Sequence, residues 1–229
     1  MLLDGLGTLV ALEPPWPALV RELRAAHGME LAPEAAERAF RAEIAYYRAH
    51  HHEARDGEAL EDLRDRCART LHAQLPAAAA RALSEGQVRA AMLAALRFRA
   101  YPDAPVALAA LRARGAVLVV VSNWDVSLPA VLRAVGLGGL VDGVVTSAEV
   151  GHPKPARAIF DAALARAGCP ADAALHVGDS VEYDVHGALA AGIRPLLLDR
   201  DGGGEEVPPG VAAIASLTEL LALSELRTA

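Results

Sequence analysis

The sequence has 229 residues, a length that suits one domain of ordinary size with a modest insertion, or two small domains. Hydrophobic residues make up 53% and aromatic residues only 4%, so the core is built mainly from alanine, leucine and valine. The net charge of −7 disfavours nucleic acid or an anionic membrane surface as a partner, because both require a basic field.

Cysteine usage and the absence of targeting signals indicate a cytoplasmic protein. Cys67 and Cys169 lie far apart, in no spacing typical of metal ligands or redox pairs. No apolar run reaches the length of a transmembrane helix, and the first residues do not have the pattern of a signal peptide. We therefore expect reduced thiols, a cytoplasmic location and no membrane partner.

The first predicted element is a short buried strand, residues 1–4, which leads into the glycine-rich turn Gly5-Leu6-Gly7-Thr8. Residues 14–99 are then predicted to be entirely helical. Pro15 and Pro33 suit the first turns of two of these helices, and further helices are expected at about 57–74 and 85–97.

From Tyr101 onward, helices alternate with continuous apolar strands. The strands are predicted at 117–121, 143–146, 174–177, 195–198 and 211–215, and the helices at 105–114, 127–136, 155–167, 182–191 and from about 217. This pattern predicts an α/β fold, a Rossmann-like doubly wound parallel sheet covered on both faces. The first strand belongs to this sheet, so 1–13 and 100–229 form the core and 14–99 is a helical insertion. The glycine-rich run 201–205 is interpreted as a flexible connection.

Polar side chains follow the predicted strands at the edge where such sheets bind ligands. Asp4 ends the first strand, Ser122 and Asn123 end the second, and Asp179 follows the fourth. Lys154, the only lysine of the sequence, follows the third strand and precedes a helix. A single aspartate at such a place is often a helix cap, but four positions in this order predict a common site.

These segments resemble the haloacid dehalogenase superfamily, a group of hydrolases with an aspartate nucleophile. The matching segments are Asp4-Gly-Leu-Gly-Thr8-Leu, Val-Val-Val-Ser122-Asn123, Gly151-His-Pro-Lys154-Pro155 and Gly178-Asp179-Ser180-Val-Glu-Tyr-Asp184. The resemblance implies a catalytic core with a helical cap inserted between the first and second motifs. It also implies hydrolysis through a covalent intermediate on Asp4.

Each matching residue has an expected role in this chemistry. The Thr8 hydroxyl can orient the Asp4 carboxylate, and Ser122 can bind the oxygens of a transferring phosphoryl group. Lys154 supplies a positive charge to that group and to Asp4. We therefore expect these three side chains to lie close to Asp4.

A divalent metal is expected because Asp4, Asp179 and Asp184 cannot all stay ionised beside one lysine. Mg²⁺ suits one or two carboxylates together with water and phosphate. By resemblance, its ligands are Asp4, the backbone carbonyl of Leu6 and Asp179, while Asp184 orders a metal-bound water.

Leu6 is a departure from the resemblance. Most phosphatases of the family have an aspartate here that acts as general acid and base, and loss of a general acid typically costs about 10²–10⁴-fold in rate.

We expect an Mg²⁺-dependent phosphatase of a small phosphorylated metabolite that favours good leaving groups. A metal-free 2-haloacid dehalogenase and a weakly active binding protein are the alternatives. A Schiff-base mechanism on a cap lysine is excluded, because Lys154 lies outside residues 14–99.

The cap offers a substitute proton donor or a specificity surface. Glu43, Tyr46, Tyr47, His50 and His51 share one helix face, whereas Ala42, Ala45 and Ala49 on the opposite face are predicted to pack closely. Tyr46, Tyr47 and His50, together with Leu6 and Asn123, are therefore candidate substrate contacts; the alternative is a solvated polar face. Successive His50, His51 and His52 diverge on a helix, which argues against a metal site. The oligomeric state stays open.

Overall fold

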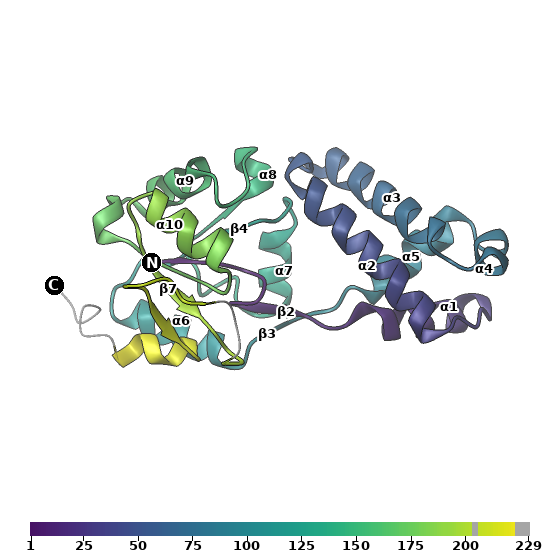
Figure 1. The fold of residues 1–229 in the computed structure, drawn as a ribbon, viewed down its shortest axis with the longest axis horizontal. Helices are drawn as coiled ribbons and strands as arrows, with labels where there is room; N and C mark the ends of the chain where they lie inside the picture. The colour runs from purple at the N-terminus through teal and green to yellow at the C-terminus, as the bar shows by residue number, and fades with distance from the viewer. Residues whose placement is uncertain (203–205, 223–229) are drawn as a thin grey trace. The chain divides into compact units, whose positions relative to one another are not determined.

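The computed structural model describes residues 1–202 and 206–222 (Figure 1). The chain forms two compact units. The core unit comprises Met1–Ala11 and Arg99–Ala229, and the helical unit comprises Leu12–Phe98. Residues 203–205, within the predicted flexible connection, and residues beyond 222 lie outside the described part of the chain.

A parallel sheet organises the core unit. Within the described residues it has six strands in the order β5-β4-β1-β6-β7-β8, and every adjacent pair is parallel. The strands are β1 (Leu2–Leu3), β4 (Val119–Ser122), β5 (Gly143–Thr146), β6 (Leu175–Gly178), β7 (Arg194–Leu198) and β8 (Ala212–Ile214). This arrangement confirms the predicted doubly wound α/β fold, with the first strand at its centre.

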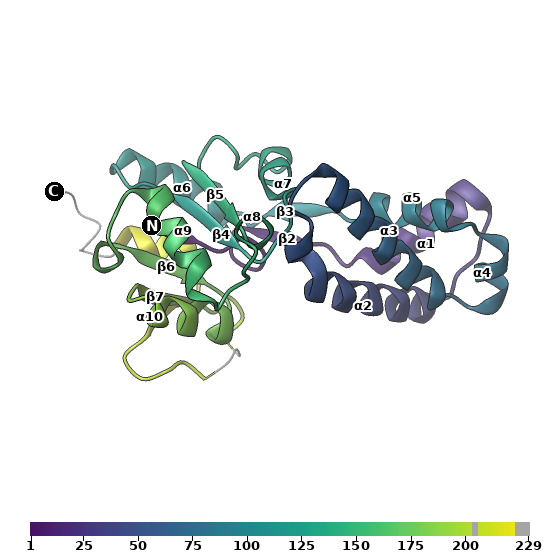
Figure 2. The same ribbon diagram turned by 90° about the horizontal axis from the view of Figure 1, so that it is seen from above.

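Helices cover both faces of this sheet (Figures 1 and 2). They are α6 (Asp103–Ala113), α7 (Leu128–Ala134), α8 (Ser147–Val150), α9 (Arg157–Ala167) and α10 (Gly187–Ala190), with 3₁₀ helices η2 (Ala171–Ala173) and η4 (Leu217–Ala222) and the π-helix η3 (Val181–His186). On one face, Ile159 and Phe160 of α9 and Ala188 of α10 pack against Leu2 and Val119. Figure 1 shows α6 on the other side of the strands. Burial on both faces explains why the strands are continuously apolar.

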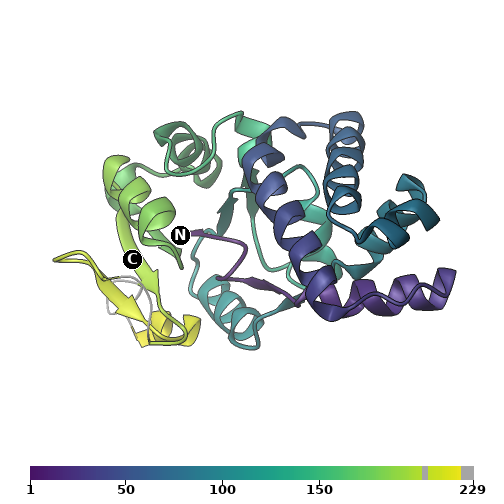
Figure 3. The ribbon, with the colours of Figure 1, turned by 45° about the vertical axis from the view of Figure 1, so that its right-hand side comes forward.

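The helical unit is built from α1 (Pro15–His27), α2 (Pro33–His50), η1 (His51–Glu53), α3 (Gly57–Ala73), α4 (Ala77–Ala82) and α5 (Glu85–Ala95). Within it, α2 packs along α3, and α1 packs on α5 (Figure 3). The helix ends follow local chemistry. Asp56 caps α3 by accepting a hydrogen bond from Ala59 N at 2.9 Å, and Ser84 and Gln87 form a reciprocal capping box on α5. None of the described helices is long and apolar enough to span a lipid bilayer.

Three local features differ from the sequence prediction. Residues 98–99 were expected to be helical, but Phe98–Ala100 forms strand β3, which pairs with β2 (Val10–Leu12) in a separate small sheet. The helix expected over 182–191 begins as the π-helix η3, and its α-helical part is only Gly187–Ala190. The described start of the terminal helix, Leu217–Ala222, is 3₁₀. Hydrogen bonds such as that from Glu13 N to Arg97 O, at 2.9 Å, outweigh helix propensity where two extended segments meet.

Candidate active site

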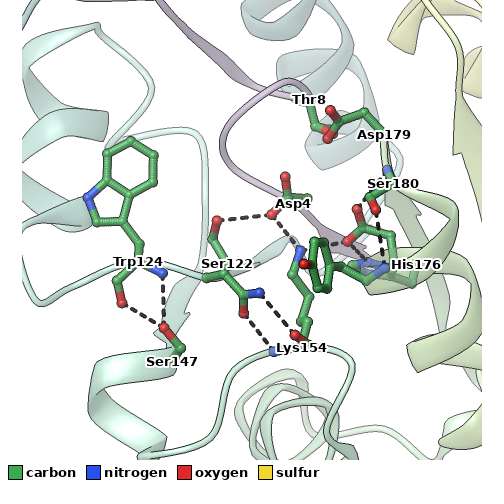
Figure 4. A network of polar contacts seen from close by, with 12 residues as sticks. Asp4, Thr8, Ser122, Trp124, Ser147, Lys154, His176, Asp179 and Ser180 are labelled. Carbon is green, nitrogen blue, oxygen red and sulfur yellow. Dashed lines mark hydrogen bonds and ion pairs between the residues drawn. The ribbon is translucent and has the colours of Figure 1, made fainter. Parts of the chain in front are cut away.

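The sheet order brings three of the predicted residues to neighbouring strand ends. β1 lies between β4 and β6, with Leu3 in register with Val120 on one side and Val177 on the other. Asp4 follows β1 directly, Ser122 closes β4, and Asp179 follows β6. Figure 4 shows Asp4 beside Ser122 and Lys154, with Asp179 next to Thr8; Lys154 comes from the loop after α8. The predicted convergence of separate motifs therefore exists in the structure.

Lys154 joins two of the carboxylates. Its Nζ donates to Asp4 Oδ1 and to Asp184 Oδ1, each at 2.6 Å, and all three side chains are buried. Ser122 Oγ donates to the same Asp4 oxygen at 2.9 Å. The nucleophile candidate is thus held at one oxygen by an ammonium and a hydroxyl. Burial strengthens these charge-assisted bonds because water does not compete for them.

Asp184 is held by more than Lys154. Its carboxylate also accepts hydrogen bonds from His176 Nε2 at 2.8 Å and from Ser180 N at 3.1 Å. Gly178 makes this close approach possible, since a Cβ there would lie 2.1 Å from Asp184 Cγ. The structure thus makes Asp184 the anchor of Lys154, a role the sequence interpretation did not assign.

His176 is a site residue that the sequence interpretation missed. It lies on β6, is fully buried, and meets the Phe160 ring edge-on with centroids 5.2 Å apart. Nδ1 has no hydrogen-bond partner among the described residues. One signal was available in the sequence: His176 is the one polar residue of the otherwise apolar segment 174–177.

The turn after Asp4 brings its backbone against Asp179. Gly7 has φ +87°, and a Cβ at that position would lie 2.1 Å from Asp179 Oδ2, so only glycine fits there. The turn also carries the Thr8 hydroxyl to Asp179 Oδ1, at 3.4 Å. The expectation that Thr8 orients Asp4 is therefore wrong: the left-handed Gly7 directs the Thr8 side chain to the carboxylate that follows β6.

The three carboxylates differ in charge balance. Burial raises the pKa of Asp4, although Lys154 opposes the shift. Burial also acts on Asp184, but Lys154 and His176 outweigh it and lower the pKa of that carboxyl. The Asp179 side chain is exposed at the surface. Even so, partial desolvation of its carboxylate, together with the negative charges of Asp4 and Asp184, raises its pKa to about 7. The pKa of Lys154 is raised by the two carboxylates against the effect of burial, so the ammonium stays charged.

The donor set fits a hard divalent cation. One ligand atom from each of Asp4, Asp179 and Asp184 lies within 4.8 Å of the other two. Three carboxylates beside one ammonium leave two negative charges, and the raised pKa of Asp179 shows that this excess is costly. Mg²⁺ is bound in proteins by such carboxylate oxygens. The chemistry of these residues therefore fits a metal.

Asn123 and its neighbours stabilise the loops around the site. Asn123 Oδ1 accepts from Lys154 N at 2.6 Å, and its Nδ2 donates to Lys154 O at 3.0 Å. Its amide thus positions the Lys154 backbone, and the predicted substrate contact stays a prediction. Trp124 N donates to Ser147 Oγ at 3.0 Å, and Asp125 accepts from Ser127 N at 2.6 Å. Asp125 therefore has the local capping role expected for a loop aspartate.

The predicted cap face is only partly buried within the helical unit, because Tyr46, Tyr47 and His50 are half-buried. Glu43 and His51 are buried, and the Tyr46 hydroxyl accepts a hydrogen bond from Arg66 at 3.1 Å. The Tyr46 ring stacks on His50 with centroids 4.1 Å apart. The Tyr47 ring lies 5.7 Å from that of His51. Roles of Tyr46, Tyr47 and His50 in substrate binding stay predictions.

The close-packing prediction for the alanine face of α2 is wrong. Ala45 and Ala49 are exposed and Ala42 is half-buried. Exposing alanine costs little because it has little apolar surface, whereas aromatic rings gain more from burial. Leu6 is 36% exposed, so a leucine side chain emerges two residues after the nucleophile candidate.

In the parallel α/β core, two aspartates that follow β1 and β6 lie with a lysine and a third carboxylate in one site, and this arrangement fits a hydrolase with an aspartate nucleophile. The model of the haloacid dehalogenase-like hydrolase family matches residues 2–192. The chain belongs to this family, which confirms the predicted resemblance.

Curated relatives bear different functional names. Over 202 residues, the chain is 32% identical to haloacid dehalogenase-like hydrolase domain-containing protein 3 of Homo sapiens, covering 85% of this chain and 79% of the human protein. It is 38% identical over 99 residues to ribulose-1,5-bisphosphate 5-phosphatase of Halopiger xanaduensis, covering 43% of this chain and 41% of that enzyme. The chain spans about half the length of the first curated relatives it matches.

Solved structures share the fold. A HAD phosphatase from Thermococcus onnurineus has a TM-score of 0.66 at 24% identity, covering 99% of this chain and 98% of that chain. L-2-haloacid dehalogenase from Xanthobacter autotrophicus has a TM-score of 0.66 at 19% identity, covering 97% and 96%. Fold similarity therefore does not separate phosphatase from dehalogenase.

Proposed function

We propose that this protein is an Mg²⁺-dependent phosphatase that hydrolyses a small phosphorylated metabolite through an aspartyl-phosphate on Asp4. One observation carries the proposal. A buried carboxylate stands at the end of the central strand, bound by Lys154 at 2.6 Å and Ser122 at 2.9 Å. Beside it, burial and the charges of Asp4 and Asp184 raise the pKa of Asp179 to about 7 although Lys154 opposes the shift.

The reaction has two displacement steps at phosphorus. A carboxylate oxygen of Asp4 attacks the phosphorus, forming a P–O bond while the bond to the leaving oxygen breaks and its electrons depart with that oxygen. Water then attacks the phosphorus of the aspartyl-phosphate, the P–O bond to Asp4 breaks, and inorganic phosphate and the free carboxylate result. Covalent catalysis divides one difficult displacement into two easier ones.

The protein's own residues orient and stabilise these steps. Lys154 and Ser122 fix the Asp4 carboxylate, and both can also stabilise negative charge on the transferring phosphoryl oxygens. Asp184 and His176 hold Lys154 in place. Mg²⁺, held by the carboxylates of Asp4 and Asp179 and the carbonyl of Leu6, would neutralise phosphoryl charge when bound. The helical unit would act as the cap that excludes water.

Leu6 restricts the substrate. A leucine side chain cannot donate a proton, so an alkoxide leaving group would depart unprotonated unless the substrate or another residue supplies the acid. Phenolate and carboxylate leaving groups need little such help. We therefore place aryl and acyl phosphates ahead of simple alkyl phosphates, with Tyr47 or His50 of the helical unit as candidate substitute acids.

The names of relatives support phosphoryl transfer. Sequence relatives include proteins named ribulose-1,5-bisphosphate 5-phosphatase, glyceraldehyde 3-phosphate phosphatase and phosphoserine phosphatase. The second candidate, metal-free 2-haloacid dehalogenation, is favoured only by Leu6. Metal-free chemistry would gain nothing from Asp179, whose charge is repelled by Asp4 and Asp184.

One assay separates the candidates. The protein is incubated with p-nitrophenyl phosphate, acetyl phosphate and 2-chloropropionate, each with Mg²⁺ and with a chelator, and Asp4→Asn serves as the inactive control. We expect phosphate release that requires both Mg²⁺ and Asp4. Chloride release that resists the chelator would establish the dehalogenase instead, and no turnover of any substrate would favour a binding protein.

Restoring the missing acid tests the role of Leu6. In Leu6→Asp, hydrolysis of an alkyl phosphate should rise by about 10²-fold, while hydrolysis of p-nitrophenyl phosphate changes little, because only the alkoxide needs protonation. Leu6→Asn is the matched control, with a similar polar shape but no proton to give. If both variants behave alike, the missing general acid is not what limits alkyl-phosphate turnover.

A further inference from the structure

Arg200 contacts the turn that carries the nucleophile, although it is 192 residues away in sequence. It lies just after β7. Its Nη2 donates to Thr8 O at 2.7 Å and its Nε to Gly7 O at 3.3 Å. One guanidinium therefore holds two consecutive backbone carbonyls of the turn.

Two neighbouring side chains fix the guanidinium itself. Nη1 donates to Asp103 Oδ2 at 2.9 Å, and the group lies over the Tyr101 ring, 3.9 Å from its centroid. Asp103 Oδ2 also accepts from Ser216 Oγ at 3.0 Å and from Leu217 N at 2.8 Å. Burial alone would raise the pKa of Asp103, but these hydrogen bonds lower it, so the carboxylate stays charged opposite Arg200.

The backbone around Arg200 is also anchored. Asp199 N donates to Ile214 O at 2.9 Å, and Asp199 Oδ1 accepts from Gly202 N at 3.0 Å. Arg200 thus projects from a fixed point between β7 and β8. Its side chain is 17% exposed, and its electrostatic interactions are correspondingly less screened by water.

The two residues that Arg200 holds are the ones that contact Asp179. Gly7 approaches Asp179 so closely that a Cβ would overlap the carboxylate, and the Thr8 hydroxyl reaches Asp179 Oδ1 at 3.4 Å. The same turn begins at Asp4. The position of the turn therefore sets the separation between Asp4 and Asp179, the two carboxylates to which the proposed function assigns the metal.

We propose that Arg200 is a positioning residue that holds the turn 5–8 so that Asp4 and Asp179 stand at the spacing a divalent metal requires. The inference rests on the proposed function. Arginine suits this place because three separate nitrogens of its planar group donate to two carbonyls and a carboxylate, whereas a lysine ammonium carries all its donors on one nitrogen and lacks this fixed, spread geometry. The family match ends at residue 192, so Arg200 lies outside the matched region.

The test measures metal binding in two ways. In Arg200→Met, the Mg²⁺ concentration that gives half-maximal activity should rise by about 10–100-fold, whereas kcat at saturating Mg²⁺ falls only a few-fold. The rise in melting temperature that Mg²⁺ gives the parent without substrate should shift to correspondingly higher Mg²⁺. Arg200→Lys should resemble Arg200→Met, and Asp103→Asn should show a smaller shift in the same direction.

Arg114→Met is the matched control, because Arg114 also donates to a backbone carbonyl, Leu221 O at 2.7 Å, but contacts no site residue among those described here. It should lose stability without a change in Mg²⁺ dependence. Unchanged Mg²⁺ dependence in folded Arg200→Met and Asp103→Asn would overturn the inference while leaving the proposed function intact. A parent protein that does not respond to Mg²⁺ in either measurement would overturn both.

Discussion

Both units of this protein bury a carboxyl group, but the pKa of the buried group is lowered in the core unit and raised in the helical unit. In the core unit, Asp184 is buried beside Lys154 and His176, which lower its pKa and keep it ionised. In the helical unit, Glu43 is buried on α2, and burial raises its pKa to about 7, opposed only by a hydrogen bond with Cys67. Burial of a carboxylate is therefore compatible with a charged acid in the core unit, whereas in the helical unit it favours the neutral acid.

The comparison shows that a buried acid gains its chemistry from its partner and not from burial itself. Moving a charge out of water is unfavourable, so an acid without a cation becomes neutral instead. Asp179 lies between these cases. It belongs to the core cluster, but its pKa is raised to about 7 as in Glu43, and being accessible it can recruit a cation from solution.

Replacing Lys154, the ammonium buried between Asp4 and Asp184, should have the largest effect on stability and activity. In Lys154→Met, Asp4 and Asp184 lose the ammonium that lies 2.6 Å from each. We expect the free energy of unfolding to fall by about 3–5 kcal/mol, as for other broken buried pairs, and kcat to fall by about 10²–10³-fold. Denaturant unfolding and steady-state kinetics measure the two effects.

An exposed pair supplies the control. Arg157 and Asp161 lie 3.3 Å apart with side chains 67% and 52% exposed, so Arg157→Met should cost less than about 1 kcal/mol. Equal destabilisation by the two variants would contradict the claim that burial makes the Lys154 contacts decisive. Lys154→Arg should not restore activity, because the guanidinium is larger and planar.

The sequence predicted the fold and the strand-end residues well because both depend on local pattern. Apolar runs such as Val117-Leu118-Val119-Val120-Val121 fix the element type, and motif order along the chain places Asp4, Ser122 and Asp179 at strand ends. The short β2–β3 pair escaped prediction because it depends on two segments, separated by the whole helical unit, meeting in space.

Side-chain partners were harder to predict than positions. Thr8 was assigned to Asp4, but the left-handed backbone of Gly7 sends its hydroxyl to Asp179, a consequence of one dihedral angle. His176 could have been noticed as a polar residue in a buried strand. The role of Arg200 could not be predicted from the sequence. Its partners on the turn are backbone carbonyls, which every residue type carries, so the sequence does not reveal the contact.

The neutral acid of the helical unit predicts a pH dependence. Glu43 ionises near 4.5 when unfolded and near 7 when folded, so rising pH through this window favours unfolding as the unfolded chain releases its proton first. At pH above 7 the loss should reach about 3 kcal/mol. Glu43→Gln should therefore be more stable than the parent above pH 7, and the difference should vanish below the unfolded pKa.

Denaturant unfolding as a function of pH measures this effect, with Glu37→Gln as the control. Glu37 lies on the same helix in an accessible pair with Arg41 at 2.6 Å, and its replacement should change stability by less than about 1 kcal/mol at any pH. If Glu43→Gln gains nothing in alkaline solution, then Glu43 is not a buried neutral acid.

The smallest effect is expected at Asp179, the carboxylate between the two cases. Without metal, its raised pKa means that the folded protein loses stability as pH rises from 3.8 to about 7 and stays destabilised above. Asp179→Asn should then raise the melting temperature by a few degrees in alkaline, metal-free solution, and it should abolish the further rise that Mg²⁺ gives the parent. Thermal unfolding with and without Mg²⁺ separates the two effects, and Asp172→Asn, at an exposed aspartate of η2, should alter neither. A variant that lost stability without metal would show that Asp179 is already balanced within the protein, and the core would then need no cation beyond Lys154.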